Sequence, residues 1–516
     1  MHAGLQGHSD MMVSQFDQLQ RKLVPLWESI GRSDPGGALE DENTVVVVPS
    51  LSVDVELSGS ALQAYEERFM FMLFLLRQPL IRLIYVTSQA VHPSIVDYYL
   101  HTLPGSIVSN ARKRLFMVAP FDDSPRTLTE KLLERPRFLR HIRSLIPDMD
   151  RAHLVPYNTT ERERELAVQL GIPMYAADPR FFGFGTKSGC RQIFSEEGVR
   201  HPLGFENLRS EEAILAAIAQ MRSQKPEIQR VIVKLNEGVA GMGNAVVDLS
   251  VLPPPGDSRE AKELTERLHR MRFEMADLTY ETYVEKVVDG GAIVEELIIG
   301  EAFESPSAQL RVSPLGELEL LSTHDQLLGG PSGQTYLGAT FPANQDYGPQ
   351  IMREAAKVGR RFAREGIVGR FAVDFVVVKS SSGEWEPYAI EVNLRKGGTT
   401  HPFLTLQYLT DGRYDAELGE FATAQGHPKY YLASDHVSDP SYRVFTPELL
   451  FDVLSHHRLQ FDHTSQTGVV LHMMSAVGSL GNLGVTAIAD SPDDARRLYD
   501  RFVAVLDAES QRALTP

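Results

Sequence analysis

The chain has 516 residues, which is enough for two to four domains with sizeable hydrophobic cores. Its hydrophobic content of 43% and its charged content of 23% are ordinary for a globular protein. The formal net charge of −17 argues against general binding of nucleic acid or of an anionic membrane surface, since both favour a basic face.

The N-terminus and the cysteine content favour the cytoplasm. Residues 1–10 lack a basic start and a long apolar run, so we expect no signal peptide. The most apolar stretch, residues 69–76, is shorter than the ~20 residues that a membrane span needs, and we expect a buried helix there. Cys190 is the single cysteine, so an internal disulfide is excluded and a small buried side chain is expected.

Residues 1–182 alternate strand-like and helix-like runs, which predicts an open α/β domain. Residues 44–50, 82–88 and 114–120 are apolar runs typical of buried parallel strands, and residues 152–157 are a fourth candidate. No phosphate-binding fingerprint follows these strands, so we assign no nucleotide to this domain.

The next segments combine lysines with glycine-rich loops. Lys187 lies where a glycine-containing loop enters a predicted helix, and Lys234 lies on a strand that leads into a glycine-rich turn. The glycines of that turn are Gly238, Gly241 and Gly243. Such glycines let main-chain N–H groups approach an anion, although an ordinary hairpin and a solvated lysine fit the pattern as well. Neither a P-loop nor a Rossmann fingerprint is present.

Two later segments are candidates for a strand that grips a nucleotide. Residues 294–301 form an apolar run with acidic interruptions, which suit ribose hydroxyls or the adenine amino group, and residues 283–288 are the second candidate. A strand with one solvated face explains the first segment equally well. The candidate contacts in the first segment are Glu295, Glu296, Leu297 and Glu301.

A predicted hairpin carries the most informative polar residues. Asp374 interrupts an apolar strand at residues 369–378, and Glu391 and Asn393 interrupt the strand that follows. Side chains two apart on a strand share a face, about 7 Å apart along the chain, so Glu391, Asn393 and Arg395 line up. Carboxylate and amide oxygens are ligands for magnesium, and a guanidinium suits a phosphoryl group. The alternative is a pair of edge-strand acids that face water.

The order of these elements resembles the ATP-grasp superfamily. In that family two lysines and a mobile glycine loop hold the ATP phosphates, and a linker strand grips adenosine. An acid on one strand and a Glu-x-Asn pair on the next bind two Mg²⁺ (or Mn²⁺) ions. An acidic residue shortly after the hinge often meets ribose there, which favours residues 294–301 as the linker. Finer motifs are similar to the pheganomycin-type peptide ligase family: TKSGCR, SPSAQLRV, STHDQ, FPA and NLRKGGTTHPF.

The resemblance implies a fold of mixed α/β and α+β class in three parts. Residues 1–182 would form a pre-ATP-grasp α/β domain, and residues 426–516 a small C-terminal α+β lobe. Residues 183–425 would form the ATP-grasp domain, with a glycine-loop lobe at about 183–300 and a metal-binding core at about 301–425.

The implied function is an ATP-dependent carboxylate–amine ligase that forms an amide or peptide bond through an acyl phosphate and releases ADP and phosphate. Arg395 and Lys234 would be the catalytic residues. The substrates would be small-molecule or peptide carboxylates and amines, and a homodimer is expected by family analogy. The alternatives are a catalytically silent ATP-binding regulator and an ATP-grasp carboxylase or thioester-forming enzyme.

Five further residues are candidates for the substrate side, and each could equally have a structural role. We assign no general base, because a lone histidine is more often structural than catalytic. The candidates are Gln309, Arg311, His324, Gln326 and His401.

Overall fold

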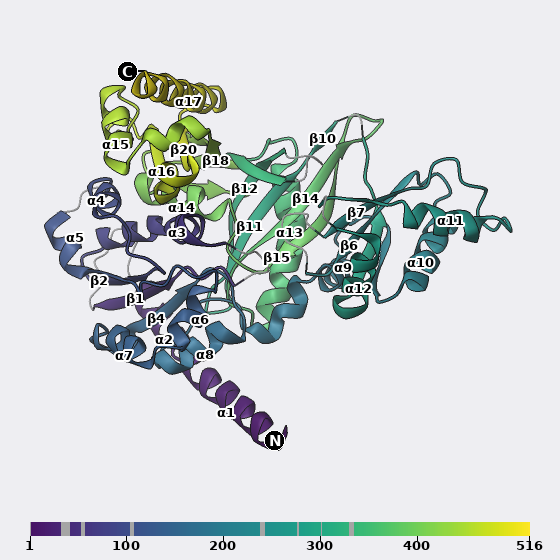
Figure 1. Cartoon of the computed structure of the whole chain (residues 1–516), viewed down its shortest axis with the longest axis horizontal. Coiled ribbons are helices and arrows are strands. Elements are labelled where there is room, and N and C mark those ends of the chain that lie inside the picture. Colours follow the sequence, from purple (N-terminus) through teal and green to yellow (C-terminus); the bar gives the residue numbers. More distant parts are fainter. Residues whose placement is uncertain are drawn as a thin grey trace.

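The computed structural model describes residues 2–31, 42–52, 57–103, 108–237, 243–275, 278–300, 302–329 and 335–515. A large antiparallel sheet occupies the centre of the molecule (Figure 1). An N-terminal α/β domain and the C-terminal segment lie on one side of it, and a smaller lobe projects on the other side.

The N-terminal domain contains a parallel sheet of order β3-β2-β1-β4, which confirms the four predicted strands. The predicted buried helix is also present, but as a 3-10 helix, η1 (Met70–Arg77), whose apolar side chains fill the core. The strands are β1 (Asn43–Val48), β2 (Ile81–Val86), β3 (Leu115–Val118) and β4 (Ala152–Pro156). The helices are α1 (His2–Gln20), α2 (Leu23–Gly31), α3 (Gly59–Glu67), α4 (Pro93–His101), α5 (Val108–Arg114), α6 (Leu128–Leu133), α7 (Pro136–Ser144), α8 (Glu161–Leu170), η2 (Met149–Arg151) and η3 (Pro179–Gly185).

The projecting lobe is an antiparallel sheet of order β5-β9-β6-β7-β8 with helices packed against it. Residues 283–288, the second candidate for the linker strand, lie in helix α12 instead. Tyr283 and Val287 are four residues apart and bury one face of that helix, and the Thr279 side chain caps its start. The elements are β5 (Gly204–Leu208), β6 (Arg230–Leu235), β7 (Asn244–Asp248), β8 (Arg272–Phe273), β9 (Ala292–Glu296), α9 (Lys187–Glu196), α10 (Glu211–Gln224), α11 (Glu260–His269) and α12 (Tyr280–Gly290).

The central sheet has the order β10-β14-β11-β12-β13-β18-β20-β19, and β15 also pairs with β14. Helix α13 (Gly348–Glu365) packs on β11 and β12 and buries a row of apolar residues there. The strands of this region are β10 (Phe303–Glu304), β11 (Pro306–Val312), β12 (Leu318–Gly329), β13 (Thr335–Phe341), β14 (Gly369–Lys379) and β15 (Trp385–Asn393). They are followed by α14 (Thr400–Thr410) and a small hairpin of β16 (Arg413–Asp415) and β17 (Glu420–Ala422).

The C-terminal segment has the expected α+β composition, but it does not form a sheet of its own. Strand β18 (Tyr430–Ser438) pairs with β13 on one edge and with β20 on the other. Because most of β18 is buried, both of its edges need backbone partners, and the segment extends the central sheet. The remaining elements are β19 (Gly468–His472), β20 (Asn482–Ala489), α15 (Pro447–His456), α16 (Val477–Leu480), α17 (Pro492–Leu514), η4 (Pro440–Val444) and η5 (Met474–Ala476).

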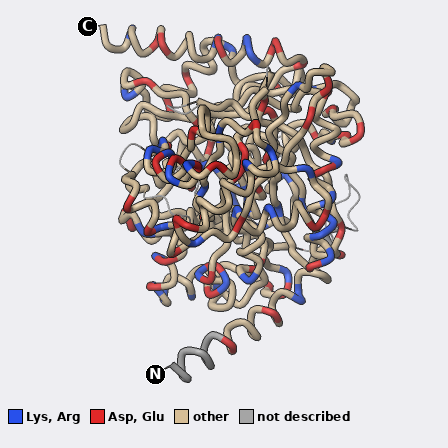
Figure 2. The backbone as a smooth tube through the Cα atoms, turned by 90° about the vertical axis from the view of Figure 1, so that its right-hand side faces the viewer, with Lys and Arg blue, Asp and Glu red and all other residues tan. Residues whose placement is uncertain are grey.

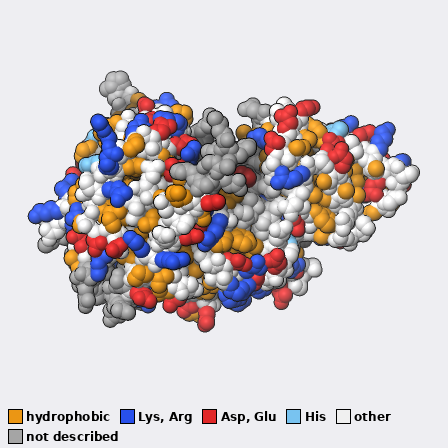
Figure 3. Space-filling model, turned by 90° about the horizontal axis from the view of Figure 1, so that it is seen from below, with side chains coloured by type: hydrophobic (Ala, Val, Ile, Leu, Met, Phe, Trp, Pro, Cys, Tyr) orange, Lys and Arg blue, Asp and Glu red, His pale blue; other side chains and the backbone are white. Residues whose placement is uncertain are grey.

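Acidic and basic residues are interspersed along the backbone (Figure 2). They are also intermixed on the face drawn in Figure 3, which carries no extended basic region among its described residues. None of the helices in the described ranges has the length and apolar character that crossing a bilayer requires.

Candidate active site

A cavity of about 750 Å³ lies where the N-terminal domain, the projecting lobe and the central sheet meet. This volume is in the range of small-molecule sites in proteins. Its polar wall comes from elements far apart in the sequence. The charged and polar lining residues include Arg68, Tyr157, Lys187, Arg230, Lys234, Asn244, Glu295, Glu296, Ser305, Ser307, Gln326, Tyr336, Asp374, Glu391, Asn393, Arg395 and Thr399.

The predicted metal residues lie together on one side of this cavity, which we call the acidic edge: Asp374, Glu391 and Asn393. Asp374 on β14 is paired directly with Glu391 on β15, and Asn393 lies two residues further along the same strand. The Asn393 amide donates a hydrogen bond from Nδ2 to Oδ2 of Asp374, at 2.8 Å. The hairpin thus brings two carboxylates and one amide to a single face.

The acidic edge has the donor chemistry of a magnesium site. Burial raises the pKa of Asp374 to about 6, and the negative charge of Glu391 adds to that rise. The hydrogen bonds from Ser307 and Asn393 and the positive charge of Arg395 act against it. A bound cation would stabilise the two facing carboxylates, and carboxylate and amide oxygens are the ligands that hard divalent cations prefer. These residues therefore fit one or more Mg²⁺ ions.

Both predicted phosphate lysines line the cavity. Lys187 is the first residue of α9, and its Nζ lies 3.5 Å from Oε1 of Glu391. Thr186 caps this helix by accepting a hydrogen bond from the Gly189 N–H at 3.1 Å, so the helix N-terminus adds partial positive charge beside Lys187. Lys234 on β6 is buried and forms an ion pair with Glu295.

The glycine turn is only partly described. Gly238, Gly241 and Glu301 lie outside the described residues, and their predicted roles stay predictions. Gly243 lies at the base of the β6–β7 hairpin, where its carbonyl accepts hydrogen bonds from the Leu235 N–H at 3.0 Å and the Tyr283 hydroxyl at 3.1 Å.

The acidic residues of the predicted linker have protein partners. Glu295 is 2% exposed, and it pairs with Lys234 and also with Arg191 at 3.1 Å. Glu296 pairs with Lys225 at 2.5 Å. The buried carboxylate of Glu295 needs such cationic partners, while Glu296 is half-buried. Both residues line the cavity, and their contacts with a nucleotide stay a prediction. Leu297, directly after β9, lines the cavity as predicted.

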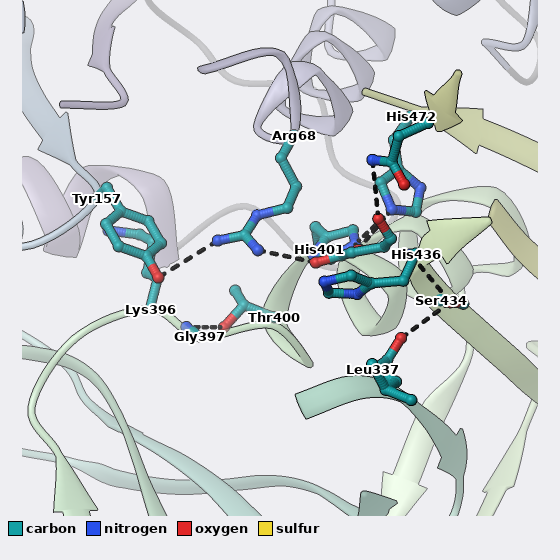
Figure 4. A network of polar contacts seen from close by, with 12 residues as sticks. Arg68, Tyr157, Leu337, Lys396, Gly397, Thr400, His401, Ser434, His436 and His472 are labelled. Carbon is teal, nitrogen blue, oxygen red and sulfur yellow. Dashed lines mark hydrogen bonds and ion pairs between the residues drawn. The ribbon is translucent and has the colours of Figure 1, made fainter. Parts of the chain in front are cut away.

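The cavity also has a positively charged region, which we call the guanidinium wall: Arg68, Tyr157 and Arg395. Figure 4 shows Arg68 and Tyr157. The Tyr157 hydroxyl accepts a hydrogen bond from Arg395 Nη1 and another from Arg68 Nη2, each at 3.3 Å. Arg68 and Tyr157 were not among the predicted site residues. For Tyr157 a signal was present, because it directly follows the fourth parallel strand, and ligands bind at the carboxyl ends of such strands.

Of the five substrate candidates, the structure places Gln326 on the cavity wall. The other four are held by protein partners elsewhere. Gln309 bonds to Thr399 and Thr400, and Arg311 forms a two-pronged pair with Glu319, at 2.8 and 2.6 Å. His324 is fully buried between Ser322 and Tyr431, and burial lowers its pKa to about 3.

His401 belongs to a buried cluster with Asp435 and His472 (Figure 4). The Nε2 atoms of His401 and His472 lie 3.1 and 2.8 Å from Oδ1 of Asp435. The other oxygen, Oδ2, pairs with Arg68 at 2.8 Å. Two imidazoles and a carboxylate can hold a metal ion. Here the two imidazoles contact the carboxylate of Asp435, which in turn orients Arg68. His401 does not line the cavity.

Family models match much of the chain. The model described as "IQCH-like, ATP-grasp" matches residues 182–268 and 257–417, and that of the PGM1 C-terminal domain matches residues 450–502. In solved structures, the fold is similar to a biotin carboxylase β-γ-ATP complex from Campylobacter jejuni. That likeness has a TM-score of 0.53 and 12% identity, and it covers 92% of this chain and 95% of the other.

Two curated relatives are similar in sequence. The L-propargylglycine–L-glutamate ligase of Streptantibioticus cattleyicolor is 30% identical over 436 residues, or 83% of this chain and 86% of the relative. The IQ motif-containing protein H of Danio rerio is 25% identical over 435 residues, and the match spans 76% of this chain and 40% of that protein. The identity to the first relative, which extends over more than four fifths of both chains, agrees with the cavity and its acidic edge. The chain therefore belongs to the ATP-grasp family, in the group of ligases that includes this relative.

Proposed function

We propose that the chain joins an amino-acid carboxylate to the amine of an amino acid or peptide through an acyl phosphate, with release of ADP and phosphate. The observation that supports this proposal most directly is that the negatively charged acidic edge and the positively charged guanidinium wall line the same cavity. A phosphorylated carboxylate and a metal-bound nucleotide need both kinds of charge within reach of each other.

Asp374, Glu391 and Asn393 would hold the magnesium ions, two by family analogy, which neutralise charge on the phosphates when bound. Lys187 supports that edge from a helix N-terminus, and its ammonium would face the phosphates. Lys234 is held by the buried carboxylate of Glu295, so its position is fixed before the substrates bind.

Arg395 is suited to the transferred phosphoryl group. Its Nη1 donates to the Lys396 carbonyl at 3.1 Å, which orients the guanidinium, and also donates to the Tyr157 hydroxyl. The other N–H groups of the planar guanidinium would donate hydrogen bonds to oxygens of the phosphoryl group and to the carbonyl oxygen of the acyl group that the amine attacks. A preorganised donor of this kind acts without reorganisation during the reaction.

The test is release of phosphate from ATP in the presence of paired acids and amines. Amino acids and dipeptides are screened in pairs, and we expect release that requires both partners, with the coupled product seen by mass spectrometry. Propargylglycine and glutamate, the substrates in the name of the curated relative, belong in the first panel.

Two other results would redirect the assignment. Binding of ATP without turnover across the panel would favour a regulatory ATP-binding protein. Phosphate release that needs bicarbonate or a thiol instead of an amine would favour a carboxylase or thioester-forming enzyme. The homodimer and the cytoplasmic location stay predictions that gel filtration and fractionation can test.

A further inference from the structure

The phenol of Tyr157 occupies an unusual position, because two guanidiniums converge on its oxygen. Arg68 follows α3 in the N-terminal domain, and Arg395 follows β15 in the central sheet. Each donates to the phenol oxygen at 3.3 Å, and each guanidinium carbon also lies over the ring, at 5.6 and 5.9 Å from its centroid. The phenol therefore has two fixed positive neighbours.

These two hydrogen bonds decide where the hydroxyl proton can go. A phenol oxygen that accepts two hydrogen bonds has its acceptor positions filled, so its own proton points away from both guanidiniums. Tyr157 lines the cavity and is 7% exposed. If the phenol loses its proton, the same two donors stabilise the negative charge on the oxygen.

The charged groups around Tyr157 favour that ionised form. Burial opposes it, but Arg395 and Arg68 outweigh burial and lower the pKa of Tyr157 below its usual value, while Asp435 raises it. Asp435 is mainly engaged with Arg68, at 2.8 Å. Tyr65 and Tyr336 also lie near Tyr157, and both have a raised pKa because of burial, so they remain neutral phenols. Burial lowers the pKa of Lys396 to about 7, but its Nζ donates to the Pro156 carbonyl at 2.6 Å and the residue does not line the cavity.

The rest of the cavity lining offers poor alternatives as a base. Its described residues include no histidine and no cysteine. Glu295 and Glu296 are ion-paired with lysine and arginine side chains, and Asp374 and Glu391 form the acidic edge. Lys187 and Lys234 are cations that hold carboxylates. Among the described side chains of the lining, this leaves Tyr157, whose two arginine neighbours favour loss of its proton.

We propose that Tyr157 is the general base that accepts a proton from the amine substrate. This inference rests on the proposed ligase function. An ammonium gives one N–H proton to the phenolate oxygen of Tyr157, and the freed nitrogen lone pair forms the C–N bond to the acyl phosphate carbon. As the C–O bond to phosphate breaks, the phosphate leaves with the electron pair of that bond and takes up the second proton of the attacking nitrogen, which leaves a neutral amide. The phenol later returns its proton to solvent.

The experiment compares two nucleophiles in the Tyr157→Phe variant. An α-amino acid is mostly an ammonium at pH 7 and needs a base, whereas hydroxylamine is already neutral at that pH. We expect ligation of the amino acid to fall about 100-fold, a usual size for lost general-base catalysis, while hydroxamate formation stays within about twofold of wild type. The amino-acid defect should shrink as the pH rises toward the pKa of the amine itself.

Tyr99→Phe is the matched control, because it removes a buried phenol of the same domain whose hydroxyl donates to the Leu471 carbonyl at 3.1 Å, outside the cavity lining. It should leave both rates unchanged. Equal losses with both nucleophiles in Tyr157→Phe would show a structural role and overturn the inference, and so would unchanged ligation of the amino acid. Absence of hydroxamate from the wild type with every acid tested would instead count against the proposed function.

Discussion

The acidic edge and the guanidinium wall differ in how they are built and in the charge they present. The acidic edge comes from two strands joined by one short hairpin, and it faces two carboxylates toward each other. The guanidinium wall joins residues from the N-terminal domain and the central sheet, and its two arginines share a phenol. Among the described residues, Arg395 has no carboxylate at ion-pair distance, so each region carries charge that a ligand could balance.

This difference indicates which part of a substrate each region takes. The acidic edge suits cations bound to a triphosphate, and the guanidinium wall suits the anionic oxygens formed as the phosphoryl group moves to a carboxylate. The two together, around one cavity, favour group transfer between bound partners.

The largest effect is expected from Asp374→Asn at the acidic edge. The change keeps the shape of the side chain but removes the charge that would hold the metal, so phosphate release should fall at least about 100-fold while the thermal melt stays close to wild type. Glu384→Gln is the control, since it removes an exposed carboxylate near the turn of the same hairpin and should have no effect. Turnover of Asp374→Asn at the wild-type rate would make the metal assignment wrong.

Arg395→Lys tests the guanidinium wall. A lysine keeps the charge but has no planar fork, so it cannot hold Tyr157 and two phosphoryl oxygens together, and we expect kcat to fall about 10- to 100-fold. The exposed Arg413→Lys serves as the control. A full rate in Arg395→Lys would show that charge alone is sufficient there.

Asp435→Asn tests the ion pair that orients Arg68 in the guanidinium wall. The pKa of Asp435 is held well below its usual value because His401 and Arg68 outweigh burial. Removing this buried charge leaves Arg68 without its carboxylate and should cost about 3–5 kcal/mol in the free energy of unfolding, measured with urea. Asp452→Asn, an exposed residue of α15, should change it by less than about 0.5 kcal/mol. Equal stabilities of the two variants would rule out this supporting role.

Measurements of ATP affinity over a range of pH should show how protonation of the acidic edge affects binding. Because the pKa of Asp374 is raised to about 6, its carboxylate takes up a proton as the pH falls through that value, and a protonated carboxyl is a poor metal ligand. Calorimetry should show magnesium-dependent ATP affinity falling below pH 6. The folding stability of the protein without metal or ATP should change in the opposite direction. A carboxyl group whose pKa is raised in the folded state adds stability at low pH, and this contribution is lost as the pH rises through about 6. Constant affinity from pH 7 to about pH 5 would contradict this charge balance.

The smallest effect is expected for alkylation of Cys190, which contacts the strand that carries Glu391 and Asn393. Its sulfur accepts a hydrogen bond from the Val392 N–H at 3.1 Å, and burial raises its pKa to about 12. Iodoacetamide at pH 8 should therefore leave the native protein unmodified and alkylate the denatured chain. Mass spectrometry can count the adducts, and rapid labelling of the native protein would show that this part of the core opens.

The acidic edge could be predicted because its residues interrupt two adjacent apolar strands, and strand alternation places them on one face. The guanidinium wall could not, since Arg68 and Tyr157 meet Arg395 only through the packing of separate domains. Packing also decides contacts that the local pattern does not reveal. Glu295 lines the cavity, where the distant Arg191 pairs with it, whereas His401 lies outside the cavity lining and contacts Asp435.

The central claim is that a carboxylate is phosphorylated in this cavity before the amine attacks. It can be tested with an acid substrate whose carboxyl group carries a heavy oxygen label. Transfer of the phosphoryl group to that carboxylate predicts that the released phosphate carries one labelled oxygen, seen by mass spectrometry. Phosphate without label, formed at the same rate as the amide, would contradict the account.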